Sequence, residues 1–148
     1  MDSVIYTEEF LRSIDIHTLL PQQEPFVMVS RLISYSSDAA ATETDVAASN
    51  ILVEDGRFTP AGLLENIAQT CAARTGFYYI YILKIDVTVG VIGAVRNYTI
   101  HELPPVGAVI QTRMKIIQEV FGMTMAEAEV VCGDKVYATA EIKLSVRE

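Results

Sequence analysis

The feature that most constrains the fold is an almost uninterrupted apolar run from Thr59 to Leu83. A single acid, Glu65, stands in this run four residues before an amide, Gln69. Residues with this spacing lie on the same face of a helix. A carboxylate on such a helix must be paired, hydrogen-bonded or neutralised, because an isolated buried charge is costly. We therefore predict one long buried helix and take Glu65 as the first candidate for a functional residue.

The run reaches the roughly 20 residues that a bilayer requires of a spanning helix. Its content argues against a membrane span, because Glu65, Gln69 and Arg74 are expensive in hydrocarbon. Thr59 is suited to cap the helix, and Pro60 to occupy its first position, where a missing N–H costs nothing. The sequence thus predicts a central helix of a soluble protein.

Composition narrows the class of protein further. With 148 residues, 51% of them apolar, the chain is expected to form a single domain over residues 1–148. A net charge of −8 argues against nucleic acid and anionic membranes as partners. Cys71 and Cys132 have no metal-ligand spacing and are too few for a disulfide framework, so we expect free thiols and no metal site. The first ten residues carry acids and lack a secretion signal, which predicts a cytoplasmic protein.

Strand patterns surround the long helix on both sides. After a short helix at Thr7–Ile14, we predict strands at Phe26–Tyr35, Ala41–Ala48, Val87–Ile100, Ala108–Val120, Met123–Cys132 and Val136–Val146. The strand at Val87–Ile100 is expected to be mostly buried. In the last strand apolar and polar residues alternate, so one face of the sheet must be covered. The long helix is the only element large enough, and the predicted fold class is α+β: an antiparallel sheet wrapped around one long central helix.

Two short stretches carry a resemblance to a known family. Leu20-Pro21-Gln22-Gln23-Glu24-Pro25-Phe26 resembles the Leu-Pro-His-Arg-Tyr-Pro-Phe stretch of the 3-hydroxyacyl-[acyl carrier protein] dehydratases. Glu65-Asn66-Ile67-Ala68-Gln69 is similar to the Glu-Ala-Met-Ala-Gln on their central helix. The resemblance implies a hot-dog fold from about Ile16 to the C-terminus. It also implies an acyl thioester substrate carried on the phosphopantetheine of acyl carrier protein or on coenzyme A, with no further cofactor.

The chain departs from the family at one catalytic position. Gln22 stands where the family places its histidine, and an amide cannot exchange a proton near neutral pH. Dehydration requires a base, an acid and donors facing the thioester oxygen. The resemblance implies that the base is the missing histidine and that the acid is a helix carboxyl of the partner subunit. We therefore predict Glu65 as the acid and Gln69 as the side chain that steadies it. Without a positioned base the rate falls on the order of a hundred- to ten-thousand-fold, so we expect weak or no dehydration.

The remaining site residues are predicted from their places next to these motifs. Two histidines, His17 and His101, stay open as substitutes for the missing base. Backbone N–H groups at the start of the helix are expected to meet the thioester oxygen. The residues expected to contact substrate are Pro25, Phe26, Pro60, Ala61 and Gly62.

Three functions stay open on the sequence. The first is a dehydratase-like enzyme of fatty-acid or related lipid or polyketide synthesis. The second is a non-catalytic acyl-binding or scaffolding subunit that pairs with an active dehydratase. The third is a hot-dog thioesterase, whose helix carboxylate directs water or attacks the acyl carbon. Glu65 is alternatively a structural acid paired with an arginine such as Arg96. The expected partners are acyl carrier protein and a second hot-dog chain, its own copy or a relative, joined through the Val87–Ile100 edge as a dimer or higher oligomer.

Overall fold

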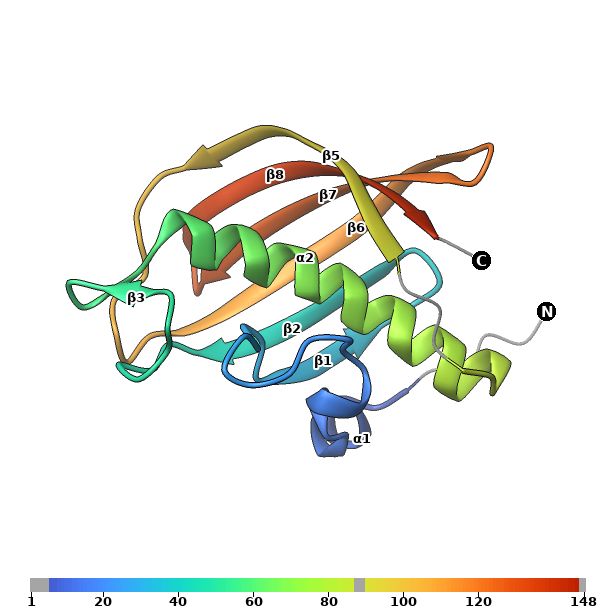
Figure 1. The fold of residues 1–148 in the computed structure, drawn as a ribbon, viewed down its shortest axis with the longest axis horizontal. Helices are drawn as coiled ribbons and strands as arrows, with labels where there is room; N and C mark the ends of the chain where they lie inside the picture. Colours follow the sequence, from blue (N-terminus) through green and yellow to red (C-terminus); the bar gives the residue numbers. More distant parts are fainter. Residues whose placement is uncertain (1–5, 87–89, 147–148) are drawn as a thin grey trace.

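A six-stranded antiparallel sheet curls around one long helix in the computed structural model, which describes residues 6–86 and 90–146 (Figure 1). Across the sheet the strands follow the order β1 (Arg31–Tyr35), β2 (Ala39–Asp45), β6 (Val109–Val120), β7 (Met123–Cys132), β8 (Lys135–Val146) and β5 (Gly90–Ile100). This arrangement confirms the predicted fold class. A separate small hairpin, for which the sequence predicts no strand, pairs β3 (Val53–Glu54) with β4 (Arg57–Phe58).

The central helix begins where its sequence predicts. Helix α2 (Pro60–Phe77) continues as a π-helical segment, η2 (Tyr78–Leu83). The Thr59 hydroxyl accepts a hydrogen bond from the Gly62 N–H at 3.2 Å, and Pro60 occupies the first helical position. Farther along, a Cβ at Gly76 would stand 2.2 Å from the carbonyl oxygen of Leu19, so only glycine allows the helix to approach this backbone. The prediction of a helix from Thr59 to Leu83 is confirmed.

The N-terminal helix α1 (Glu8–Ser13) packs next to β1 and is followed by a 3₁₀ turn, η1 (Ile16–Thr18). An ion-pair cluster joins α1 to the sheet. Glu43 accepts hydrogen bonds from Arg12 and Arg31, each at 2.8 Å to the same carboxylate oxygen. The hydrogen bond from Arg12, ahead of the charge of Arg31, lowers the pKa of the Glu43 carboxyl.

The core lies between α2 and the inner face of the sheet. On β8 the predicted apolar face is buried at Ala138, Ala140 and Ile142. Neighbouring strands and the helix add the buried residues Ile110, Met114, Ala126, Val130, Leu63, Ile67 and Phe77. None of the helices among residues 6–86 and 90–146 combines the length and the apolar character that crossing a bilayer requires.

Two strand predictions need correction. The first strand begins at Arg31, and residues 26–30 are outside the sheet because helix side chains take backbone groups of Phe26 and Met28. The strand β5 is also not mostly buried, since each residue from 92 to 100 is at least partly exposed in the single chain. Its predicted start at Val87 falls outside the described residues. The exposure follows from position, because β5 forms an edge of the sheet and pairs on one side only, with β8.

Candidate functional site

Gln69 connects the two motifs through its side-chain amide. It is fully buried on α2, and its Oε1 accepts a hydrogen bond from the Met28 N–H at 2.6 Å. Its Nε2 donates to the Phe26 carbonyl at 2.8 Å and to Glu65 Oε1 at 3.1 Å. The structure therefore brings Glu65, Gln69 and Phe26 together around one amide.

Asn66 completes this attachment, and sequence reasoning missed it. Its Nδ2 donates to the Met28 carbonyl at 2.7 Å and to Thr44 Oγ1 at 3.0 Å. Its Oδ1 accepts from the hydroxyl of Thr112 on β6. Asn66 and Gln69 stand three residues apart on one helix face and together take both backbone groups of Met28. The available signal was a buried amide inside an apolar helix, which requires hydrogen-bond partners.

Glu65 is half-buried and is held by the amide of Gln69. The alternative that it forms a structural ion pair finds no support, because none of the ion pairs formed by the described residues includes Glu65. Arg96 is exposed on the edge strand β5. The Glu65 carboxyl is therefore held by one neutral amide and is partly open to solvent.

Gln22 lies in the loop between η1 and β1. Its Oε1 is buried and has no hydrogen-bond partner among the described residues. A buried unpaired acceptor costs about 1–3 kcal/mol. At this position an amide offers a hydrogen-bond acceptor and a donor but no group that takes up a proton near neutral pH, so the motif lacks a base here.

The start of α2 offers fewer donors than the sequence suggested. Pro60 has no N–H, and the Gly62 N–H is taken by the Thr59 cap. A Cβ at Gly62 would stand 2.4 Å from the ring of Phe58, so packing alone requires glycine there. Ala61 remains as the candidate donor to a thioester oxygen.

The two histidines considered as substitutes for the missing base lie in different surroundings. The exposed ring of His17 lies between two carboxylates, with Nε2 3.0 Å from Glu24 Oε1 and Nδ1 2.7 Å from Asp15 Oδ1. The hydrogen bonds with Glu24 and Asp15, in that order, raise the pKa of His17, which disfavours the neutral form that a base requires. His101 is exposed just beyond β5. Neither ring hydrogen-bonds to Glu65 or Gln69 in the described part of the chain.

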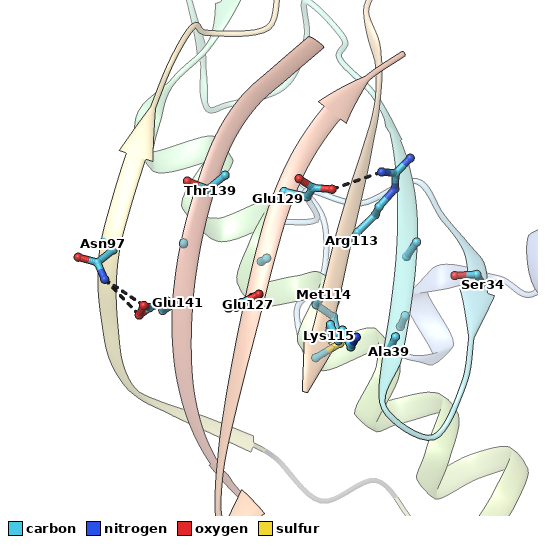
Figure 2. Close-up of a pocket in the computed structure, with 14 residues that line it drawn as sticks. Ser34, Ala39, Asn97, Arg113, Met114, Lys115, Glu127, Glu129, Thr139 and Glu141 are labelled. Carbon is cyan, nitrogen blue, oxygen red and sulfur yellow. Dashed lines mark hydrogen bonds and ion pairs between the residues drawn. The ribbon is translucent and has the colours of Figure 1, made fainter. Parts of the chain in front are cut away.

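Two hollows lie away from Glu65. One of about 370 Å³ is lined by His17, Glu24, Pro25 and residues of β2. The other, of about 700 Å³, lies on the sheet face opposite α2 (Figure 2). Figure 2 shows two hydrogen bonds across its strands: Arg113 donates to Glu129 at 3.3 Å, and Asn97 donates to Glu141 at 2.9 Å. Among the described residues no group of three or more His, Cys, Asp or Glu side chains is arranged to bind a metal ion.

Solved structures share this architecture. A chain of the dehydratase heterocomplex ApeI:P from Xenorhabdus doucetiae superposes with a TM-score of 0.82 at 18% identity, covering 93% of each chain. The E. coli PaaI protein of the phenylacetic acid degradation operon superposes with a TM-score of 0.63 at 14% identity, covering 77% of this chain and 80% of its own. A hypothetical thioesterase with coenzyme A from Streptococcus pneumoniae superposes with a TM-score of 0.63 at 10% identity, covering 78% of this chain and 84% of its own. A comparison with curated protein sequences finds no match.

The sheet, the central helix and these neighbours define a protein of the hot-dog fold. The family model described as ApeP dehydratase matches residues 14–147, and the chain belongs to this ApeP-like family. The resemblance seen in the two motifs is thereby confirmed.

Proposed function

We propose that this chain binds acyl thioesters at the Glu65–Gln69 face of α2 and dehydrates 3-hydroxyacyl groups only slowly by itself. The observation that carries the proposal is the shared amide of Gln69, which ties the Glu65 carboxyl to the carbonyl of Phe26 in the other motif. The acyl group is carried on phosphopantetheine of acyl carrier protein or on coenzyme A, in fatty-acid or related lipid or polyketide synthesis.

In this reaction the protonated Glu65 carboxyl gives its proton to the departing 3-hydroxyl, which leaves as water when its C–O bond breaks. The electrons of the C–H bond beside the thioester carbonyl form the C=C bond, and the proton passes to a water molecule, because Gln22 cannot accept it. The missing base reduces the rate on the order of a hundred- to ten-thousand-fold. Ala61 at the start of α2 is the donor proposed for the thioester oxygen.

A second candidate is a non-catalytic acyl-binding subunit that pairs with an active relative. Two observations favour it: the amide at Gln22, and the outer edge of β5, which pairs with no other strand among the described residues and carries the partly exposed Ile92, Val95 and Ile100. An apolar edge strand invites pairing with another chain. The similar ApeI:P structure is described as a heterocomplex, which supports pairing with a second hot-dog protein.

One set of assays separates these functions. The protein is incubated with 3-hydroxyacyl and enoyl thioesters on acyl carrier protein and on coenzyme A, alongside the Glu65→Ala and Gln22→His variants. Slow interconversion that Glu65→Ala abolishes and Gln22→His accelerates supports the dehydratase. Binding without turnover in both the parent and Gln22→His supports the acyl-binding subunit, and release of free thiol supports a thioesterase.

The matched control is Glu127→Ala, since Glu127 is an exposed acid on the outer sheet face. Loss of activity in this control would mean that Glu65→Ala reports general damage. Absence of both binding and turnover with every thioester would refute the proposal.

A further inference from the structure

The segment that follows Gln22 is held at two places. Farther from Gln22, side chains of α2 bind its backbone: the Phe26 carbonyl accepts from Gln69, and Met28 is bound by Gln69 and Asn66. Between Gln22 and these contacts, Glu24 accepts from the ring of His17 at 3.0 Å, and the Phe26 N–H donates to the Gln23 carbonyl at 2.8 Å. The side-chain contact nearest to Gln22 in this segment is therefore the one from Glu24 to η1.

The two carboxylate contacts of the His17 ring together require a charged ring. Both ring nitrogens of His17 face carboxylate oxygens, Nε2 that of Glu24 and Nδ1 that of Asp15. A carboxylate only accepts hydrogen bonds, and a neutral imidazole has a single N–H. Both contacts are hydrogen bonds only when the ring carries two protons.

Loss of one proton would break the contact with Glu24 first. Asp15 is also the cap of η1 and accepts the backbone N–H of His17 at 3.0 Å, so it stays beside the ring in either state. The other titratable side chain around the 370 Å³ hollow is Asp45 of β2, whose carboxylate is paired with Arg31. Among the described residues around this hollow, no other carboxylate is placed to accept a hydrogen bond from the His17 ring in place of Glu24.

We propose that protonated His17 is a latch: a positioning residue that holds the Gln22 loop through Glu24 and releases it when the ring loses a proton. The raised pKa of His17, caused first by Glu24 and then by Asp15, agrees with this geometry. Because the pKa is raised in the folded protein, the latch is fully closed below the ordinary value of 6.5 and opens as the pH rises through the folded value.

Amide hydrogen exchange followed by NMR tests the latch without any acyl substrate. The reporter is the Phe26 amide, and the Leu63 amide in α2 is the reference, after correction for intrinsic rates. Between about pH 6 and pH 9 the protection of Phe26 is expected to fall two- to fivefold, the factor that corresponds to an exposed ion pair. The Leu63 amide should keep its protection.

Two variants each remove one partner of the hydrogen bond between His17 and Glu24. His17→Gln and Glu24→Gln are expected to lower the protection of Phe26 at pH 6 and to abolish its pH dependence. In Glu24→Gln the pKa of His17, followed by its ring proton resonance, should fall. His101→Gln is the matched control and should behave as the parent.

Phe26 protection that does not change with pH in the parent would overturn the proposal. So would full protection in His17→Gln at pH 6, or an unchanged His17 pKa in Glu24→Gln. Thermal unfolding of each variant separates loss of the latch from loss of the fold, because a loop effect leaves the midpoint almost unchanged.

Discussion

Replacing Gln69 with leucine removes the amide that joins α2 to the motif segment while keeping a side chain of similar volume. The Met28 N–H then loses its partner in a residue that is only 1% exposed, and such an orphaned donor costs about 1–3 kcal/mol. The Phe26 carbonyl also loses its donor, but Phe26 is 59% exposed, so water replaces part of that bond. We expect the free energy of unfolding to fall by about 2–4 kcal/mol in total.

Urea unfolding monitored by circular dichroism measures this change, and the thermal midpoint should fall by about 5–15 °C for a chain of this size. The matched control is Gln118→Leu, the same replacement at an exposed position of β6, which should change the free energy of unfolding by less than about 0.5 kcal/mol. A loss below about 1 kcal/mol in Gln69→Leu would refute the view that this amide holds the motif segment.

Three other substitutions test separate parts of the structure. Gly76→Ala should destabilise the fold by about 1–3 kcal/mol in urea unfolding, because its Cβ would meet the Leu19 carbonyl; a gain in stability would contradict that contact. Phe121→Asn should raise the free energy of unfolding by about 1 kcal/mol, because Phe121 is fully exposed at a φ of 52°, which asparagine adopts more readily. A lower midpoint of thermal unfolding would contradict this reasoning. Arg12 lowers the pKa of Glu43, so the stability from this pair is present above the ordinary value of 4.5 and is lost as the pH falls through the folded value. In urea unfolding, the free energy of unfolding of the parent should therefore fall between pH 7 and pH 3, and it should fall less in Glu43→Gln. An equal fall in both proteins would contradict this role of the pair.

The parts of the fold that were predicted correctly depend on local patterns. Thr59 and Pro60 identified the start of α2 because capping needs only neighbouring residues. The alternation on β8 identified its buried face, and the predicted strands Ala108–Val120 and Met123–Cys132 match β6 and β7 to within one residue. Each of these signals lies within a few residues of the structure it predicts.

The errors depend on contacts distant in sequence. Residues 26–30 have strand-like residue types, but their backbone groups bond to Asn66 and Gln69, about forty positions away. The strand β5 was predicted both as a sheet edge and as mostly buried; at the edge it pairs with β8, and its side chains stay at least partly exposed. The spacing of Glu65 and Gln69 predicted their hydrogen bond, whereas the two carboxylates around His17 became visible only in three dimensions.

The most direct test of the central claim is a titration of the labelled protein with a 3-hydroxyacyl pantetheine thioester, observing side-chain amides by NMR. If the acyl thioester binds at Glu65, the Nε2 resonances of Gln69 shift, because that amide donates to Oε1 of Glu65. The resonances of the Asn97 amide, which donates to Glu141 on the outer sheet face, should not shift. Shifts at Asn97 with none at Gln69, or no shift at either amide at saturating thioester, would contradict the account.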